Sequence, residues 1–353
     1  MIVTGLVCGG LLGFVMQRGR FCLAGGFRDM YLAKDNRMFY ALLIAIAIQS
    51  VGVYTLIQFG LVQYTAGVFP WLAVVIGAYV FGVGIVLAGG CATGTWYRAG
   101  EGLLGSWIAL FGYMTMSAIM KTGVLLPFST SLQSVQLPQN SIADTFGFNH
   151  WILVALLVVI TALILTSELR KPSVTVPSLR PRRRGISHLL FEKRWHPFFT
   201  AVLIGVIAIL AWPLSEATGR MDGLGITTPS ANLLQLLVTN NLAFINWGVF
   251  LVLGIFLGAF IAAKASHEFR FRMPDAKTGI RSFIGGLAMG FGASLAGGCT
   301  IGNGLVKTAM LTWQGWIALA FMILGTWTAS YFVFVRPQVK KRAADTSSPV
   351  IVS

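Results

Sequence analysis

The chain has 353 residues, of which 56% are apolar and only 10% charged, and its mean hydropathy is +0.77. A soluble domain has roughly a quarter of its residues charged, so this chain cannot cover a water-facing surface. A net charge of +15 would suit nucleic acid, but 22 of the 26 Lys and Arg residues lie in stretches 18–37, 170–196, 264–281 and 336–342. Cytoplasmic loops of membrane proteins have this basic character, so we exclude nucleic acid as a partner.

The apolar runs do not alternate with polar residues, and lipid tolerates only helices and closed barrels. They therefore predict an all-α polytopic membrane protein. In chain order the expected spans are 2–17, 38–60, 71–90, 105–123, 150–169, 197–213, 244–263, 282–297 and 312–335. Basic residues follow the first run rather than precede it, so it is expected to be a retained span and not a signal peptide. Some spans are shorter than the roughly 20 residues of a full crossing, which predicts short half-helices within the membrane.

The basic stretches orient these spans, since positive loops face the cytoplasm. Stretch 61–70 carries no charge and 124–149 carries only Asp144, so both are expected outside. Parity then puts 214–243 outside as well. We expect a multi-pass protein of the bacterial inner membrane with a periplasmic N-terminus and a cytoplasmic C-terminus.

An internal repeat is visible. Leu-Ala-Gly-Gly-Cys occurs at 87–91 and 295–299, followed each time by Trp-Ile-Ala-Leu, with one extra residue in the second gap. The expected organisation is a first transmembrane half at 1–169, a basic cytoplasmic linker at 170–196, a second transmembrane half at 197–336 and a cytoplasmic tail at 337–353. Residues 5–17 weakly resemble 248–260, which leaves 38–60 as an extra span. That odd span makes the two halves inverted, and inverted-repeat transporters bind substrate near the midplane.

The paired Gly-Gly-Cys elements are the main candidate site. Glycine allows close approach of the backbone, and the threonines that follow favour the start of a new helix. Helix N-termini suit anions, so two facing ends would hold an anion without placing Lys or Arg in lipid. The alternative is that glycine packs helices and cysteine fills space, which explains one copy better than two. The residues are Gly89, Gly90, Cys91 and Thr93 in the first copy and Gly297, Gly298, Cys299 and Thr300 in the second.

A third cysteine, Cys22, lies in a Gly-rich segment with Arg18 and Arg20. These arginines would attract and pass an anion at the cytoplasmic mouth, or else they only set topology. Cys8 lies in a plain apolar run and is expected to fill the core.

Other polar residues give weaker signals. Lys307 follows Cys299 by two helical turns and either draws anions inward or snorkels. Glu101 is close to Arg98 in the sequence, which favours a structural ion pair. The histidines lie near span ends, no cysteine pair has zinc spacing, and no Walker A pattern occurs. We therefore expect no metal, no cofactor and no ATP hydrolysis by this chain.

Three segments carry a family resemblance: QRGRFCLAGGFRDM (17–30), LAGGCATGTWYRAGEG (87–102) and LAGGCTIGNGL (295–305). They closely resemble the YeeE/YedE sulfur-transport family, and the likeness extends over essentially the whole chain. The resemblance implies an hourglass-like fold of two pseudo-symmetric halves, with thiosulfate entering from an outer, positively charged concavity. It implies that the functional cysteines are Cys22, Cys91 and Cys299. It also implies a transporter rather than an enzyme, with membrane lipids and a small TusA-like cytoplasmic sulfur carrier as partners.

These expectations combine into a relay, in which thiosulfate passes along cysteine thiols by S–H···S hydrogen bonds and supplies sulfur for cysteine synthesis. Thiols are weak donors, and weak binding lets an ion leave each site. Two alternatives stay open: transport of another sulfur or selenium oxyanion, and a membrane thiol enzyme that forms a persulfide on Cys91 or Cys299. A third reading is a scaffold for a cytoplasmic sulfurtransferase, held through the 170–196 loop, which predicts no transport.

Overall fold

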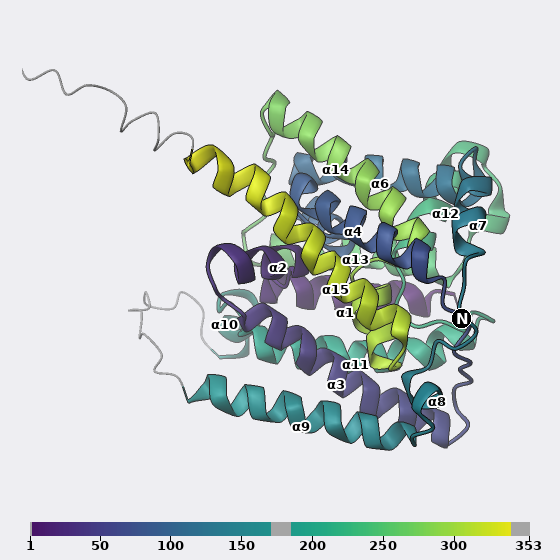
Figure 1. Ribbon diagram of the computed structural model, residues 1–353. Coiled ribbons are helices and arrows are strands. Elements are labelled where there is room, and N and C mark those ends of the chain that lie inside the picture. The colour runs from purple at the N-terminus through teal and green to yellow at the C-terminus, as the bar shows by residue number, and fades with distance from the viewer. Residues whose placement is uncertain (1, 171–184, 340–353) are drawn as a thin grey trace, which may run out of the picture.

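The computed structural model describes residues 2–170 and 185–339, and every regular element within them is a helix (Figure 1). Most of the basic linker and of the C-terminal tail therefore lies outside the described residues. The N-terminal helices are α1 (Thr4–Gly19), α2 (Leu23–Leu32), α3 (Arg37–Gln58), α4 (Trp71–Ala88), α5 (Ala92–Gly100) and α6 (Leu104–Thr122). Next come α7 (Leu126–Gln133), α8 (Ile142–Phe146), α9 (His150–Leu169) and α10 (Ile186–Phe191). The C-terminal elements are α11 (Pro197–Glu216), α12 (Thr227–Thr239), η1 (Leu242–Phe244), α13 (Trp247–Ala265), α14 (Ala276–Leu295), η2 (Gly302–Lys307), α15 (Trp313–Ser330) and η3 (Tyr331–Val335).

Among the described residues, 7 helical segments are long and apolar enough to cross a membrane, and α6 with α7, bent by 71°, would make an eighth. The 7 are Thr4–Leu32, Arg37–Gln58, Trp71–Gly100, His150–Leu169, Pro197–Glu216, Trp247–Ala265 and Trp313–Val339. The chain is therefore a multi-pass membrane protein, as the sequence predicts. Two segments continue across short breaks, so that Cys22 lies inside Thr4–Leu32 and Cys91 lies inside Trp71–Gly100.

Each expected span coincides with a helix, but α14 differs from the prediction. It begins at residue 276 instead of 282, and it is not among the segments apolar enough to cross by themselves. Asp275 caps it, since its carboxylate accepts the backbone N–H of Thr278 at 3.3 Å, which is a strong helix start. Lys277 and Arg281 then occupy the first turns. Their charge lowers the local hydropathy, so this part of the helix does not belong to the apolar run in the sequence.

Glycines bring α1 and α13 into close contact. A Cβ on Gly9 would lie 2.0 Å from the Leu251 carbonyl oxygen, and one on Gly13 would lie 2.1 Å from that of Ile255. The contacts advance in the same direction along both helices, so the helices are parallel. Small residues of this kind let backbones approach each other in a membrane, where helix association depends on van der Waals packing.

We expect Gly9→Ala to destabilise the fold, because its new Cβ has no room beside the Leu251 carbonyl oxygen. Overpacking of this kind costs about 1–3 kcal/mol. Gly10→Ala is the matched control, since a Cβ there meets only Gly254 O, at 3.9 Å. Thermal unfolding of the two purified variants in the same detergent measures the difference. Equal unfolding temperatures would contradict the packing described here.

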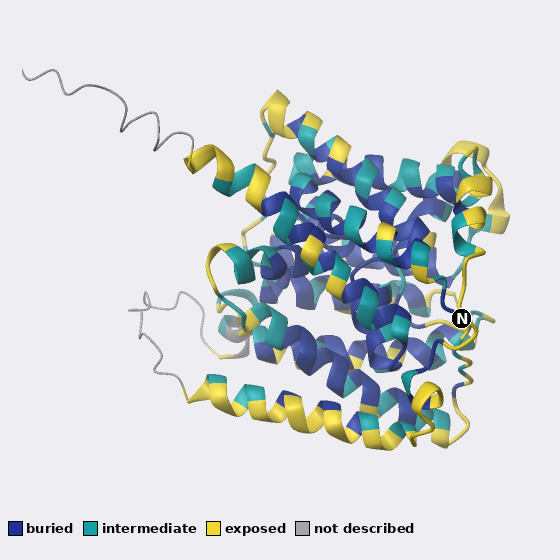
Figure 2. Ribbon diagram, in the orientation of Figure 1, coloured by how far each residue is buried: buried dark blue, intermediate teal, exposed yellow. Residues whose placement is uncertain are grey.

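The helices that carry the repeated motif also pack against each other, with α4 antiparallel to α14. Gly77 near the start of α4 faces Gly292 near the end of α14, while Gly285 in α14 faces Ala88 at the end of α4. Buried residues fill the centre of the molecule (Figure 2). By contrast α9 is exposed along most of its length, with 17% of its apolar window buried, and it lies at the periphery beside α3 (Figure 1).

Candidate functional site

The three cysteines named by the motifs all lie at helix breaks in the buried interior. Cys22 is the N-cap of α2 and Cys91 is the N-cap of α5. Cys299 precedes η2. The exposed fractions are 5% for Cys22, 1% for Cys91 and 0% for Cys299, and all three are free thiols. Cys8 is also buried, at 4%, in the interior of α1, as expected of a residue that fills the core.

The paired glycines shape the turns before Cys91 and Cys299. Gly89 and Gly297 have left-handed φ angles of +73° and +69°, a conformation that glycine adopts without strain. A Cβ on Gly298 would lie 2.9 Å from Asn303 Oδ1, and the space around Gly90 is also filled, with its nearest neighbour at 3.4 Å. Gly89, Gly297 and Gly298 therefore have a local structural reason, whereas a Cβ on Gly90 would make only ordinary contacts.

The Cys22 and Cys91 thiols are close neighbours. A Cβ on Gly94 would lie 3.3 Å from Cys91 Sγ and 3.6 Å from Cys22 Sγ. Cys91 Sγ accepts the Gly94 N–H at 3.4 Å, so the thiol itself caps the N-terminus of α5. Two breaks that are distant in the sequence thus place two thiols side by side.

The second motif reaches the first through Thr300. Its side chain lies beside the Cys91 thiol, so Cys299 is one residue away from a direct neighbour of Cys91. Cys299 in turn lies beside Thr227, whose Oγ1 accepts the Tyr113 hydroxyl at 2.9 Å. The two Gly-Gly-Cys elements therefore meet in space.

Two threonines of the motifs have unused hydrogen-bonding capacity. Thr93 and Thr300 are both 0% exposed, and neither hydroxyl oxygen has a hydrogen-bond partner among the described residues. A buried hydroxyl without a partner costs about 1–3 kcal/mol, so natural structures rarely keep one without a reason. Thr93 follows Cys91 by two residues, and Thr300 lies beside the Cys91 thiol.

A small cavity of about 50 Å³ ends at Cys299, and we call it the Cys299 cavity. Lys121, Arg220 and Lys307 line it, and Asp222 is the only acidic residue in its lining. Lys307 Nζ donates to the Gly297 carbonyl at 3.3 Å. Three cations against one carboxylate make this cavity attractive to an anion.

A larger cavity of about 770 Å³ ends at Cys22, and we call it the Cys22 cavity. Its basic lining includes Arg20, Arg28, Arg37, Arg98, Lys193 and Arg194, with Asp29 and Asp35 as the acidic members. Arg98 Nη1 donates to the Gly89 carbonyl, much as Lys307 does to the equivalent glycine of the other motif. Cys91 lines neither cavity and is buried, with its thiol near that of Cys22 and beside Thr300.

Arg18 and Arg20 belong to an ion-pair network, and Arg20 also lines the Cys22 cavity. Arg18 is 3% exposed and lies 3.6 Å from Glu268. Arg20 donates to Glu101 at 2.9 Å and to Glu268 at 2.7 Å. Arg20, and not Arg98, is therefore the ion-pair partner of Glu101. This network joins the break before α2 to the end of α5 and to the loop after α13.

Four cations lie outside the basic stretches, namely Arg98, Lys121, Arg220 and Lys307, and all four line the two cavities. Sequence analysis found Lys307 but assigned no role to Lys121 or Arg220. The signal was available, because a cation that is not part of a topology-setting loop is costly near lipid and is usually functional. No cluster of metal-ligating side chains occurs among the residues that the structure describes.

A family model described as sulphur transport matches residues 18–328, which include all three cysteines of the site. The chain belongs to the sulphur-transport family. It is 68% identical over 348 residues to the thiosulfate transporter TsuA of Escherichia coli (strain K12), with 99% of each chain covered. It is 35% identical over 350 residues to the thiosulfate transporter TsuA of Spirochaeta thermophila, with 95% of this chain and 100% of the relative covered. Membership of the sulphur-transport family confirms the resemblance read from the motifs.

Proposed function

We propose that this protein carries thiosulfate across the bacterial inner membrane into the cell. The observation that carries the proposal is the pair of cation-lined cavities, one lined by Cys299 and the other by Cys22, together with the buried thiol of Cys91 beside that of Cys22. Both relatives named above bear the name thiosulfate transporter. The Cys299 cavity would face the periplasm, since residues from the expected outer stretch 214–243 line it.

We propose a relay for the passage itself. Thiosulfate would enter the Cys299 cavity, pass Cys91 and leave at Cys22, with its terminal sulfur accepting S–H contacts in turn. Soft, weakly donating thiols suit a soft sulfur, and no single contact binds so well that it traps the ion. The cations at each end would hold the sulfonate oxygens, to which charge-assisted hydrogen bonds are strong. The unpaired hydroxyls of Thr93 and Thr300 would donate hydrogen bonds to the dianion where no cation reaches it.

We further propose that the chain consists of two pseudo-symmetric, inverted halves with an hourglass-like shape, within the ranges 1–169 and 197–336. In this assignment α1–α6 correspond to α11–α15 with η2. Corresponding contacts support it: α1 packs on α13 as α11 packs on α3, and α4 packs on α15 as α14 packs on α6. The odd crossing is then α9, in place of 38–60. The π-helical η2 absorbs the extra residue of the second repeat, so that Lys307 takes the place of Arg98.

Gly94→Ala is expected to slow thiosulfate uptake several-fold without unfolding the protein. The added Cβ would contact the Cys91 and Cys22 sulfurs at 3.3 and 3.6 Å, where the relay needs room for a sulfur atom. Alanine favours a helix over glycine by up to about 1 kcal/mol, so stability is not expected to fall. Gly10→Ala is the control, because the nearest neighbour of a Cβ there is Gly254 O, at 3.9 Å, and Gly10 lines neither cavity. Unchanged uptake by the Gly94 variant would argue against a path between these thiols.

The proposed function is tested with purified protein in liposomes. We expect labelled thiosulfate to enter these vesicles faster than protein-free ones, and unlabelled thiosulfate to compete better than sulfate or selenite. Stronger competition by another oxyanion would reassign the substrate. Absence of any uptake would favour the scaffold reading, in which the protein only docks a cytoplasmic sulfurtransferase.

A TusA-like carrier remains the proposed cytoplasmic partner, and its addition to the vesicle interior would test whether it accelerates uptake.

A further inference from the structure

We infer a second anion site in a cavity of about 410 Å³ between α2, α4, α5 and α14, lined by Arg28, Arg98, Arg272 and Arg281. We call it the arginine cavity. Its ligand class is a small dianionic oxyanion, such as thiosulfate, sulfate or hydrogen phosphate. The inference rests on the proposed function only for the assignment of this face to the cytoplasm.

The charge of the arginine cavity is unbalanced. No Asp or Glu residue is part of its lining, whereas the Cys22 cavity includes Asp29 and Asp35. Arg28 pairs with Asp29 at 2.9 Å. Within the described part of the chain, no salt bridge engages Arg98, Arg272 or Arg281. Like charges gathered in this way repel one another, and a bound dianion would relieve that repulsion.

Two of the arginines are held by the last turn of α4. Arg281 Nη2 donates to the Val86 carbonyl at 3.2 Å, and Arg98 Nη1 donates to the Gly89 carbonyl. Helix C-termini stabilise cations, so both guanidinium groups are fixed before any ligand arrives. Arg281 Nε is buried and has no hydrogen-bond partner among the described residues. A buried donor without a partner is costly, so this N–H is available to an oxygen of a bound anion.

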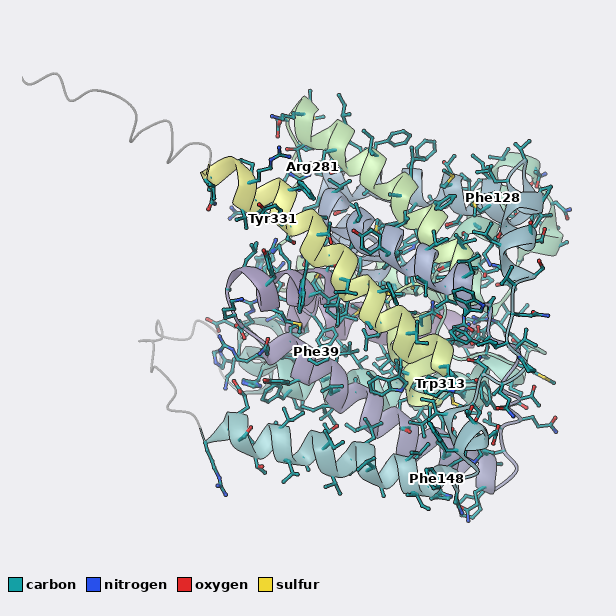
Figure 3. The ribbon with its side chains drawn as sticks, in the orientation of Figure 1. Phe39, Phe128, Phe148, Arg281, Trp313 and Tyr331 are labelled. Atoms are coloured by element: carbon teal, nitrogen blue, oxygen red, sulfur yellow. The ribbon has the colours of Figure 1, made fainter. Side chains whose placement is uncertain are left out.

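An aromatic ring holds two guanidinium groups close together. The Cζ atoms of Arg28 and Arg281 lie 5.9 and 5.7 Å from the centroid of the Phe334 ring, which is cation–π distance. Arg281 extends from α14 toward the end of the chain's last helical segment (Figure 3), and its guanidinium group lies over the Phe334 ring of η3. Three elements distant in the sequence thus converge to present cations to one cavity, as a built anion site requires.

The arginine cavity is connected to the proposed substrate path. Gly25, Arg28 and Arg98 line both this cavity and the one that ends at Cys22. An anion released from Cys22 would therefore meet Arg28 and Arg98, which line both cavities, and could pass from them to Arg272 and Arg281. Alternatively, a dianion already present in the cytoplasm would occupy the same site and oppose release.

Thr278, which lines the cavity and is exposed, allows a direct test. In inside-out vesicles that contain the full chain with Thr278→Cys, a membrane-impermeant maleimide is added in thiosulfate, sulfate, hydrogen phosphate, or potassium chloride of equal ionic strength. We expect the dianions, and not chloride, to slow labelling several-fold. Wild-type protein measures labelling of the four native cysteines. Protection by thiosulfate alone would identify the transported ion as the ligand, and equal protection by all three dianions would identify a general cytoplasmic dianion.

Matched variants separate binding from indirect effects. Adding Arg281→Gln to Thr278→Cys is expected to remove the protection, whereas adding Arg270→Gln, which alters an exposed arginine outside the lining, is expected to leave it. Lys277→Cys, one residue from Thr278 but outside the lining, should be labelled equally in all salts, which excludes consumption of the reagent by thiosulfate.

Two results would overturn the arginine site: equal labelling of Thr278→Cys in dianions and chloride, and protection that survives Arg281→Gln. Uptake of thiosulfate by vesicles that show no protection rejects this site and leaves the proposed function standing. Protection of Thr278→Cys by dianions without any thiosulfate uptake rejects the proposed function and leaves the arginine site standing. The two inferences therefore fail independently.

Discussion

Replacing Cys91 with serine is expected to reduce the initial rate of thiosulfate uptake at least tenfold. Cys91 is the one relay thiol that lines neither cavity and lies beside Cys22, so the substrate would have no way around it. Serine keeps a donor but replaces a polarisable sulfur with a smaller, harder oxygen that holds less well to the terminal sulfur of thiosulfate. A tenfold change corresponds to about 1.4 kcal/mol in the barrier.

The folded structure should survive this change. Serine is a better N-cap than cysteine, and Cys91 already accepts the Gly94 N–H at 3.4 Å, so a serine would cap α5 at least as well. Cys8→Ser is the control, because Cys8 is also buried but lies away from both cavities. Uptake into liposomes by equal amounts of monodisperse protein gives the comparison. Undiminished uptake by the Cys91 variant would show that transport does not require the sulfur atom of Cys91.

Lys307→Gln is expected to raise the Km for thiosulfate tenfold or more while changing the maximal rate less. Lys307 lines the small Cys299 cavity, and its Nζ bonds only weakly to the Gly297 carbonyl, at 3.3 Å, so it is available to an anion. A hydrogen bond to a charged group contributes about 1.5–3 kcal/mol, which corresponds to roughly tenfold or more in affinity. Glutamine keeps a donor of similar reach and removes the charge.

Lys264→Gln provides the matched loss of one positive charge. Lys264 stacks on the Phe260 and Phe269 rings at 5.7 and 5.3 Å and lines neither cavity of the path. Its replacement should leave the Km unchanged. The dependence of initial uptake rate on external thiosulfate concentration measures both variants. A Km that shifts equally in the two would show that only the net charge of the protein matters.

Much of the fold could be predicted because the strongest signals are local. Long apolar runs identified every spanning helix, and the repeated Leu-Ala-Gly-Gly-Cys located the breaks. The start of α5 was indicated by the threonines after the first motif. The short helices α2 and α12 could not be predicted, because 10 and 13 residues are too few for a clear apolar periodicity in a chain that is apolar throughout. The early start of α14 was missed for the opposite reason, since Lys277 and Arg281 break the hydropathy pattern there.

The cysteines of the site could be predicted and most of its electrostatics could not. A cysteine that follows two glycines is visible in one line of sequence, whereas the pairing of Arg20 with Glu101 depends on residues 81 positions apart. Arg98 and Lys307 bond to the Gly89 and Gly297 carbonyls of their own motifs, 9 and 10 residues earlier, but the cavities that they line are formed by several distant segments. Charge partners across a membrane fold are decided by tertiary contacts, and no local pattern encodes them.

The central claim is that intact thiosulfate travels along the thiols, and labelling its two sulfur atoms separately tests that claim most directly. Purified protein in liposomes receives thiosulfate labelled on either the terminal or the sulfonate sulfur. We predict that both labels enter at the same rate and that Cys91→Ser slows both equally. Entry of one label ahead of the other, or retention of the terminal sulfur on the protein as a persulfide, would contradict transport and establish a sulfur-transfer enzyme.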